Sequence, residues 1–121
     1  MARRLVVTLL SLAALGLMAG GAAAAPADQA TKAAVGVKDS VFDPPALAVT
    51  VGTTVTWTNG GALPHTVTAD DASVDSGTLA AGTGTFSKTF DTAGTFAYHC
   101  TFHGGAGTGM FGTIVVVAPS T

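Results

Sequence analysis

The sequence predicts an all-β domain, built as a β-sandwich or a small barrel. Several short segments are rich in β-branched and aromatic residues and alternate apolar with polar side chains. Clusters of Gly, Asp, Asn and Pro separate these segments at short intervals. After the N-terminal region, no stretch has an amphipathic helical period of useful length.

The expected strands follow one another along most of the chain. The first, 34–39, has the weakest pattern. The next two, 46–51 and 53–58, consist largely of Val and Thr in alternation and are joined at Gly52. The remaining expected strands are 65–69, 84–90, 94–100 and 111–118.

Turn signals lie between these strands, and the aromatic residues are the candidate core. The turn clusters are 43–45, 58–61, 70–77, 80–84 and 91–94. A short helical turn within 72–82 is compatible with the sequence. The expected core aromatic residues are Phe42, Trp57, Phe86, Phe90 and Phe96.

The N-terminus has the layout of a secretory signal peptide. Arg3 and Arg4 open a basic stretch, an apolar run follows, and the alanines at 22–24 offer an A-x-A cleavage site. The alternative is an uncleaved membrane anchor, which alanine and glycine favour only weakly. The export route, general or twin-arginine, stays open.

This layout divides the chain into three parts. We expect a signal peptide over 1–24, a flexible mature N-terminus over 25–33 and one domain over 34–121. The mature protein would then be extracytoplasmic (periplasmic or secreted), with no integral membrane span after cleavage. We expect it to be a monomer.

The charge of the chain excludes nucleic acid as a partner. Five basic residues stand against seven acidic ones, and removal of Arg3 and Arg4 leaves a net charge of −4. No basic patch is available for a phosphate backbone. Asp70, Asp71 and Asp75 are expected to lie in a solvated turn.

Residues 98–110 hold the chain's single Cys, Cys100, together with His99, His103 and Met110. A lone thiol in an exported protein has no disulfide partner, so it is expected to bind a metal, act as a nucleophile or lie buried. His99 neighbours Cys100 on the expected strand and should point to the other face. No third catalytic group is readable, which disfavours a Cys–His nucleophile.

A metal site needs one more donor, and His65 is the remaining histidine. One thiolate, two imidazoles and a thioether form a soft donor set. Two His and one Cys with a weak axial Met are the ligands of a blue-copper electron-transfer centre. The predicted copper ligands are therefore His65, Cys100, His103 and Met110.

Two stretches carry a family resemblance: "VGTTVTWTNGGALPHTVTADD" (51–71) and "AGTFAYHCTFHGGAGTGMFGTIVV" (93–116). Together they resemble the cupredoxins, the type 1 blue copper proteins, in the plastocyanin, pseudoazurin and amicyanin branch. The resemblance covers residues 35–117. It implies a Greek-key β-sandwich with copper near one end, equatorial ligands His65, Cys100 and His103, and Met110 as the axial ligand.

The chain departs from the family pattern at two places. Plastocyanin-like proteins place four residues between the second His and the Met, and amicyanin-like ones place two, whereas six separate His103 from Met110 here. A backbone carbonyl is the alternative axial donor. Thr66 stands where plastocyanins usually carry Asn, and its backbone N–H is expected to bond the Cys100 sulfur.

These observations predict a blue copper protein that is not an enzyme and that shuttles single electrons between a donor and an acceptor protein. Docking is expected near His103, on an apolar surface with Leu63, Pro64 and Phe102. The alternative is an extracytoplasmic copper protein for storage or delivery. Three histidines are too few for a multicopper oxidase or a nitrite reductase.

Overall fold

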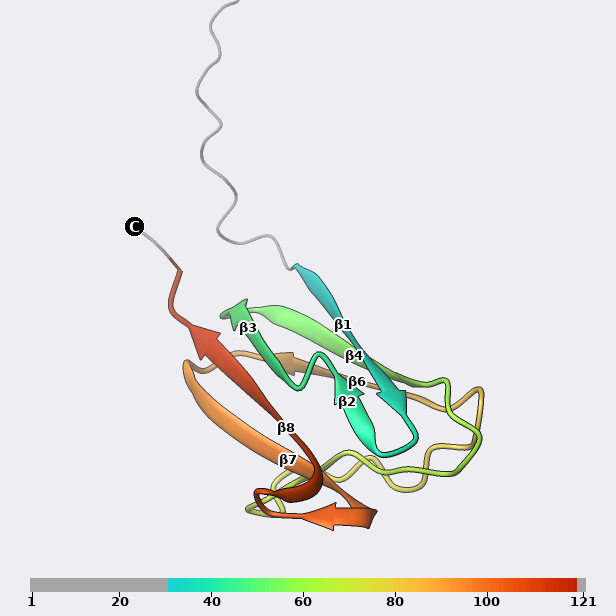
Figure 1. Ribbon diagram of the computed structural model, residues 1–121. Coiled ribbons are helices and arrows are strands. Elements are labelled where there is room, and N and C mark those ends of the chain that lie inside the picture. Colours follow the sequence, from blue (N-terminus) through green and yellow to red (C-terminus); the bar gives the residue numbers. More distant parts are fainter. Residues whose placement is uncertain (1–30, 120–121) are drawn as a thin grey trace, which may run out of the picture.

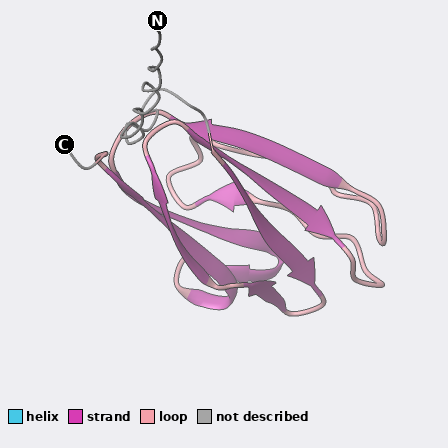
Figure 2. Cartoon of the chain, turned by 90° about the horizontal axis from the view of Figure 1, so that it is seen from above, coloured by secondary structure: helices cyan, strands magenta, loops and turns pink. Residues whose placement is uncertain are grey.

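A computed structural model describes residues 31–119 of the chain, which fold into two sheets of four strands each (Figure 1, Figure 2). No helix occurs among these residues. The strands, in chain order, are β1 Lys32–Lys38, β2 Val41–Asp43, β3 Ala46–Thr50, β4 Thr53–Asn59, β5 Thr68–Ala69, β6 Thr85–Phe90, β7 Gly94–Gly105 and β8 Thr108–Val117.

The order of the strands is that of a Greek-key sandwich. One sheet runs β2-β1-β4-β6 and the other β3-β8-β7-β5. Each connection from β2 to β7 crosses from one sheet to the other, while β1–β2 and β7–β8 are antiparallel neighbours within a sheet. The prediction of a β-sandwich is confirmed, and the small barrel is wrong because the two sheets remain separate.

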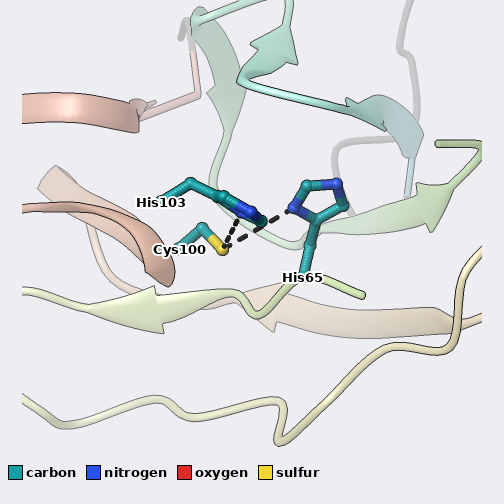
Figure 3. A group of neighbouring side chains, drawn as sticks. All are labelled: His65, Cys100 and His103. Carbon is teal, nitrogen blue, oxygen red and sulfur yellow. Dashed lines mark hydrogen bonds between the residues drawn. The ribbon is translucent and has the colours of Figure 1, made fainter. Parts of the chain in front are cut away.

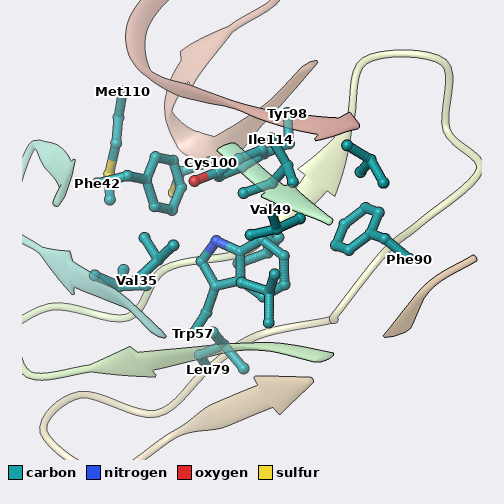
Figure 4. Close-up of a cluster of buried hydrophobic side chains, with 14 residues drawn as sticks. Val35, Phe42, Val49, Trp57, Leu79, Phe90, Tyr98, Cys100, Met110 and Ile114 are labelled. Atoms are coloured by element: carbon teal, nitrogen blue, oxygen red, sulfur yellow. The ribbon is translucent and has the colours of Figure 1, made fainter. Parts of the chain in front are cut away.

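The core lies between the sheets and follows from the alternation of the strands. In β4 the side chains of Val55 and Trp57 are buried, and Thr56 between them is more exposed. Phe42, Phe90 and Tyr98 pack into the same cluster (Figure 4). Full burial of apolar side chains of this size contributes roughly 1.5–3 kcal/mol each to folding. Phe86 and Phe96 are partly buried against this cluster rather than inside it.

Several boundaries differ from the sequence-based expectation. β1 begins at Lys32, two residues before the expected strand. β2 is only three residues long, too short for a period-two pattern to show. The expected strand 65–69 is reduced to β5 and an isolated bridge between His65 and Leu79. Residues 72–82 contain no helix; a single turn that is not continued follows at 80–84, where Gly84 N donates to Ala80 O at 2.9 Å.

The largest difference concerns 101–110, which lies between the expected strands 94–100 and 111–118. Most of it belongs to strands, because β7 runs on to Gly105 and β8 starts at Thr108. The glycines in this stretch carry no hydrophobic alternation, so the sequence pattern does not report the pairing.

The predicted signal peptide (1–24) and most of the predicted mature N-terminus (25–33) lie outside the described residues. Among residues 31–119, no helix is long and apolar enough to cross a membrane.

Candidate metal centre

Cys100 lies in β7, directly after the last residue of its regular pairing with β8, and its side chain is turned into the sandwich. Tyr98 and Cys100 are buried, and His99 between them faces the other side of the sheet. The Cys100 thiol is fully buried. His99 Nδ1 lies 2.6 Å from Asp70 Oδ1, so its ring is engaged away from the thiol.

His65 reaches the thiol from the connection between β4 and β5. Its backbone exchanges two hydrogen bonds with Leu79: His65 N donates to Leu79 O at 3.3 Å, and Leu79 N donates to His65 O at 2.7 Å. The imidazole is fully buried, and its Nδ1 lies 3.7 Å from Cys100 Sγ. An isolated bridge to Leu79 therefore holds the backbone of His65, and β7 holds the backbone of Cys100.

His103 completes the group from the far side of a bulge in β7. The pairing of β7 with β8 is regular up to His99 and resumes only at Gly104, which leaves 100–103 unpaired. Such a bulge re-aims side chains. His103 Nδ1 lies 3.6 Å from Cys100 Sγ, and its residue is exposed, unlike His65 and Cys100.

The three side chains form one cluster (Figure 3). One donor atom from each lies within 4.8 Å of the others, and the ring centroids of His65 and His103 are 4.8 Å apart. Both Nδ1 atoms point toward the sulfur. Such an arrangement, with two imidazole nitrogens around a thiol, can hold one metal ion between them.

The strand pairing accounts for the six residues between His103 and Met110. Gly104 pairs with Gly109 and Gly105 pairs with Thr108, so these residues form the tip of the β7–β8 hairpin. Met110 comes directly after this tip and therefore lies across from the unpaired segment 100–103. A Cβ on Gly104 would lie 2.4 Å from Met110 N, which shows how closely the two backbones approach.

The Met110 side chain is buried, with 1% of the residue exposed, in the same apolar cluster as Cys100 (Figure 4). The extra length of the loop is absorbed by the hairpin tip, and Met110 stays at the end of the sandwich that holds the cluster.

Thr66 links the His65 segment to the Cys100 segment. As expected, its backbone N–H donates to Cys100 Sγ, at 3.4 Å. Its hydroxyl also accepts a hydrogen bond from Thr101 N at 2.9 Å. The residue that replaces the usual Asn therefore ties the segment after His65 to Cys100 and Thr101 of β7. A hydrogen bond to a thiolate tunes the metal that the thiolate binds.

Asn59 holds the connection that precedes His65 from the inside. Its buried side-chain Nδ2 donates to Leu63 O at 2.9 Å and to Leu79 O at 3.0 Å, and its Oδ1 accepts from Gly61 N at 2.9 Å. Asn59 belongs to the stretch 51–71 that carries the family resemblance, but the sequence alone does not indicate this role for its side chain.

Asp39 holds the same connection from the outside, and sequence reasoning missed it. Its Oδ1 lies 2.9 Å from His65 Nε2, and its carboxylate accepts from Ala62 N at 3.0 Å and Leu63 N at 3.1 Å. The hydrogen bond from His65, followed by that from Ala62, lowers the pKa of Asp39 below its usual value. Asp39 is 26 residues from His65 in the sequence, and a lone turn Asp gives no signal of such a contact.

The donor set fits copper. A thiolate suits Cu(I), imidazole suits Cu(II), and two His with one Cys and a weak axial thioether define the type 1 site. An all-β sandwich with such a cluster at one end defines the cupredoxin class.

Comparisons with known proteins agree with this class. The family model for copper-binding proteins of the plastocyanin/azurin family matches residues 29–117. The chain therefore belongs to the plastocyanin/azurin family of copper-binding proteins.

Individual relatives come from two branches of that family. The chain is 41% identical over 86 residues to a plastocyanin from Scenedesmus fuscus, an alignment that covers 63% of this chain and 86% of the relative. It is 38% identical over 112 residues to amicyanin from Paracoccus denitrificans, covering 76% of this chain and 85% of the relative.

Solved structures give the same picture. An oxidised amicyanin variant superposes with a TM-score of 0.60 at 34% identity, covering 69% of this chain and 79% of that structure. A purple cupredoxin from Nitrosopumilus maritimus superposes with a TM-score of 0.58 at 27% identity, covering 69% of this chain and 98% of that structure.

Proposed function

We propose that this protein is a one-electron carrier whose copper is held by His65, Cys100 and His103, with Met110 as a weak axial ligand. The observation that carries the proposal is the convergence of the three donor atoms within 4.8 Å at one end of the sandwich. Copper bound there would supply a one-electron couple between Cu(II) and Cu(I).

The contribution of the protein is to keep the donors in place. His65 and Cys100 are fully buried, and the hydrogen bonds of Thr66, Asn59 and Asp39 hold the segments that carry them. A donor set that is already arranged needs little movement when the charge at the site changes. Burial of the thiol also protects it from water and from oxidants.

The exposed edge of the site is the proposed place of electron exchange. His103 is exposed, and Leu63, Pro64 and Phe102 near it are exposed as well, with Leu63 at 46% and Phe102 at 52%. The rings of Phe102 and His103 are 6.3 Å apart in an edge-to-face arrangement. Apolar exposed side chains of this kind mark protein interaction sites. We propose that redox partners dock here and that the protein acts as a monomer.

We also propose that the protein is an electron carrier rather than an enzyme and that it works outside the cytoplasm. The cluster in the described residues has the donors for a single copper centre and no second group of donors beside it. An extracytoplasmic location, periplasmic or secreted, is supported by the predicted signal peptide and by the single, buried thiol.

The alternative, copper storage or delivery, predicts different behaviour on reduction. A carrier loaded with one equivalent of copper should give a reversible one-electron wave in protein-film voltammetry and keep its metal over many cycles. A delivery protein should lose copper to a Cu(I) chelator once reduced. Loss of the wave after the first reduction, with copper recovered in the chelator, would contradict the carrier.

A further inference from the structure

We infer that Asp39 is the positioning residue of the metal centre, acting through His65; this inference rests on the function proposed above. Asp39 lies in the turn between β1 and β2, on a different part of the chain from every proposed ligand. Its carboxylate makes a 2.9 Å contact with the ring nitrogen of His65 that faces away from the thiol.

The contact fixes which nitrogen of His65 carries the proton. An ionised carboxylate only accepts hydrogen bonds, so Nε2 must donate to Asp39. Nδ1 is then left with its lone pair, and this is the atom that lies 3.7 Å from Cys100 Sγ. Asp39 therefore holds His65 in the tautomer whose Nδ1, the nitrogen beside Cys100, can bind a metal.

The carboxylate also fixes the backbone that carries the ring. The hydrogen bonds from Ala62 N and Leu63 N tie the connection before His65 to the β1–β2 turn. His103 lacks such a partner among the described residues, since its Nδ1 faces the thiol and its residue is exposed. The two histidines thus differ: the buried ring of His65 is held by a hydrogen bond to the exposed carboxylate of Asp39, and His103 is open to solvent.

The charge of Asp39 has a consequence for the redox balance. A carboxylate bonded to a metal-binding imidazole raises the basicity of that ligand. A more basic His65, with the negative charge of Asp39 behind it, stabilises Cu(II) more than Cu(I). Asp39 should therefore tighten copper binding and lower the reduction potential.

Gly61 makes room for this arrangement. A Cβ at Gly61 would lie 2.3 Å from Asp39 Oδ1 and 3.1 Å from Asp39 N. The neighbouring Gly60 has no atom within 4 Å of its Cβ position. An alanine at 61 would push the carboxylate away from His65, whereas one at 60 would not.

The experiment compares variants that separate the hydrogen bond between His65 and Asp39 from the negative charge of the Asp39 carboxylate. Asp39→Ala removes both, whereas Asp39→Asn keeps an oxygen acceptor for His65 but loses the charge. Asp43→Asn removes the same charge from the same β-hairpin, where Asp43 pairs only with exposed Lys38, and is the control. Gly61→Ala displaces the carboxylate without deleting it, with Gly60→Ala as its control.

Two measurements are made on each variant: the imidazole nitrogen NMR signals of the copper-free protein, and the affinity and potential of the copper-loaded protein. We expect Asp39→Ala and Gly61→Ala to mix the His65 tautomers and to weaken copper binding by about 10–100-fold. Asp39→Asn should keep the tautomer and raise the potential. Both controls should match the unmodified protein.

The outcomes separate this inference from the proposed function. If the unmodified protein forms the copper site but the Asp39 and Gly61 variants match their controls, Asp39 does not position His65. If the unmodified protein takes up no copper, the proposed function fails, and the NMR signals of the copper-free protein alone decide whether Asp39 sets the tautomer. Asp39→Asn, which keeps the hydrogen-bond acceptor, tests the charge should Asp39→Ala not fold.

Discussion

At the scale of single residues, the alternation of β7 separates two adjacent side chains with different surroundings. Cys100 points into the sandwich between His65 and His103, and His99 points outward to Asp70. Neighbours in the sequence therefore differ in what they can bind. This separation gives a direct test of the ligand assignment.

Replacing Cys100 by Ser should abolish the intense visible absorption of the copper-loaded protein and weaken copper binding, because the soft thiolate is lost. His99→Ala is the matched control and should leave the spectrum nearly unchanged. The measurement is the visible absorption spectrum of each variant after loading with the same amount of copper. Equal bleaching of both would show that the ligands are assigned wrongly.

Met110 is a separate residue-scale question, since it is buried across from segment 100–103 and would be the weakest donor. Met110→Leu conserves the volume of a buried apolar side chain, so the fold should persist. We expect the variant to keep copper and its colour and to show a higher reduction potential, because Cu(II) depends on the axial sulfur more than Cu(I) does. An unchanged potential would mean that Met110 is not a ligand, and complete loss of copper would make it a primary one.

Residue types alone made the cluster of His65, Cys100 and His103 predictable, because Cys and His are few in this chain and soft metals select them. Asp39 could not be found in the same way. Aspartate is common in turns, and only the folded chain brings the β1–β2 turn against the segment before His65.

At the scale of elements, the β7–β8 hairpin determines where the last donors lie. Its tip, 104–109, contains four glycines, and two of them, Gly107 and Gly109, have positive φ angles of 71° and 65°. The pairing of Gly104 with Gly109 brings the two backbones so close that no Cβ fits between them.

Gly104→Ala should destabilise the copper-free protein by about 1–3 kcal/mol, the usual cost of overpacking. The added Cβ would lie 2.4–2.7 Å from backbone atoms of Met110 and Thr108, which cannot move aside as a flexible side chain can. Gly105→Ala, whose Cβ would meet only Thr108 Oγ1 at 3.6 Å, should change stability by less than about 0.5 kcal/mol.

Urea unfolding of the two alanine variants measures this difference. Equal stability of the two variants would show that the tip of the hairpin is open enough to accept a side chain at either position. The close approach of Gly104 to Met110 would then not determine where Met110 lies.

Strands with a strong alternation were predictable at this scale, and elements set by pairing were not. β4 and β6 match the expected ranges within a residue or two because each buries every second side chain to some degree. β2 is too short to show a pattern, and the hairpin tip contains Gly, Thr and one exposed alanine, Ala106, with no large apolar side chain to bury. β2 and the hairpin tip are formed by backbone pairing alone, which the hydrophobic periodicity of the sequence does not report.

At the scale of the whole molecule, the two sheets are joined by an aromatic cluster centred on Tyr98, the single tyrosine of the chain. Its ring lies 4.6 Å from that of Phe42 and 5.4 Å from that of Trp57, in edge-to-face arrangements. Burial raises the pKa of Tyr98 to about 12. The phenol is thus held neutral by the fold.

This raised pKa predicts a loss of stability at alkaline pH. The pKa of Tyr98 in the folded protein lies above its unfolded value of about 10. The contribution of the neutral Tyr98 side chain to the free energy of unfolding is therefore fully present below pH ~10 and is lost as the pH rises toward ~12. Ultraviolet titration of the single tyrosine should give a midpoint well above 10, and Tyr98→Phe should remove this part of the alkaline destabilisation. A midpoint near 10 in the folded protein would contradict the buried position of the ring.

The sandwich as a whole places the donor cluster at one end and keeps it nearly closed, with only His103 reaching the surface. The fold class was predictable because alternation and turn signals recur along the chain. The way in which the cluster is supported, by Thr66, Asn59 and Asp39 from three separate segments, depends on the tertiary contacts of the folded domain.

The central claim is that this end of the sandwich holds one copper ion on a thiolate and two imidazoles and cycles it between two oxidation states. The absorption spectrum of the protein during titration with Cu(II), followed by reduction and reoxidation, tests it most directly. We predict an intense visible thiolate-to-copper band that saturates at one equivalent, disappears on reduction and returns in full on reoxidation. A protein that stays colourless with Cu(II) and binds only Cu(I) would contradict the claim.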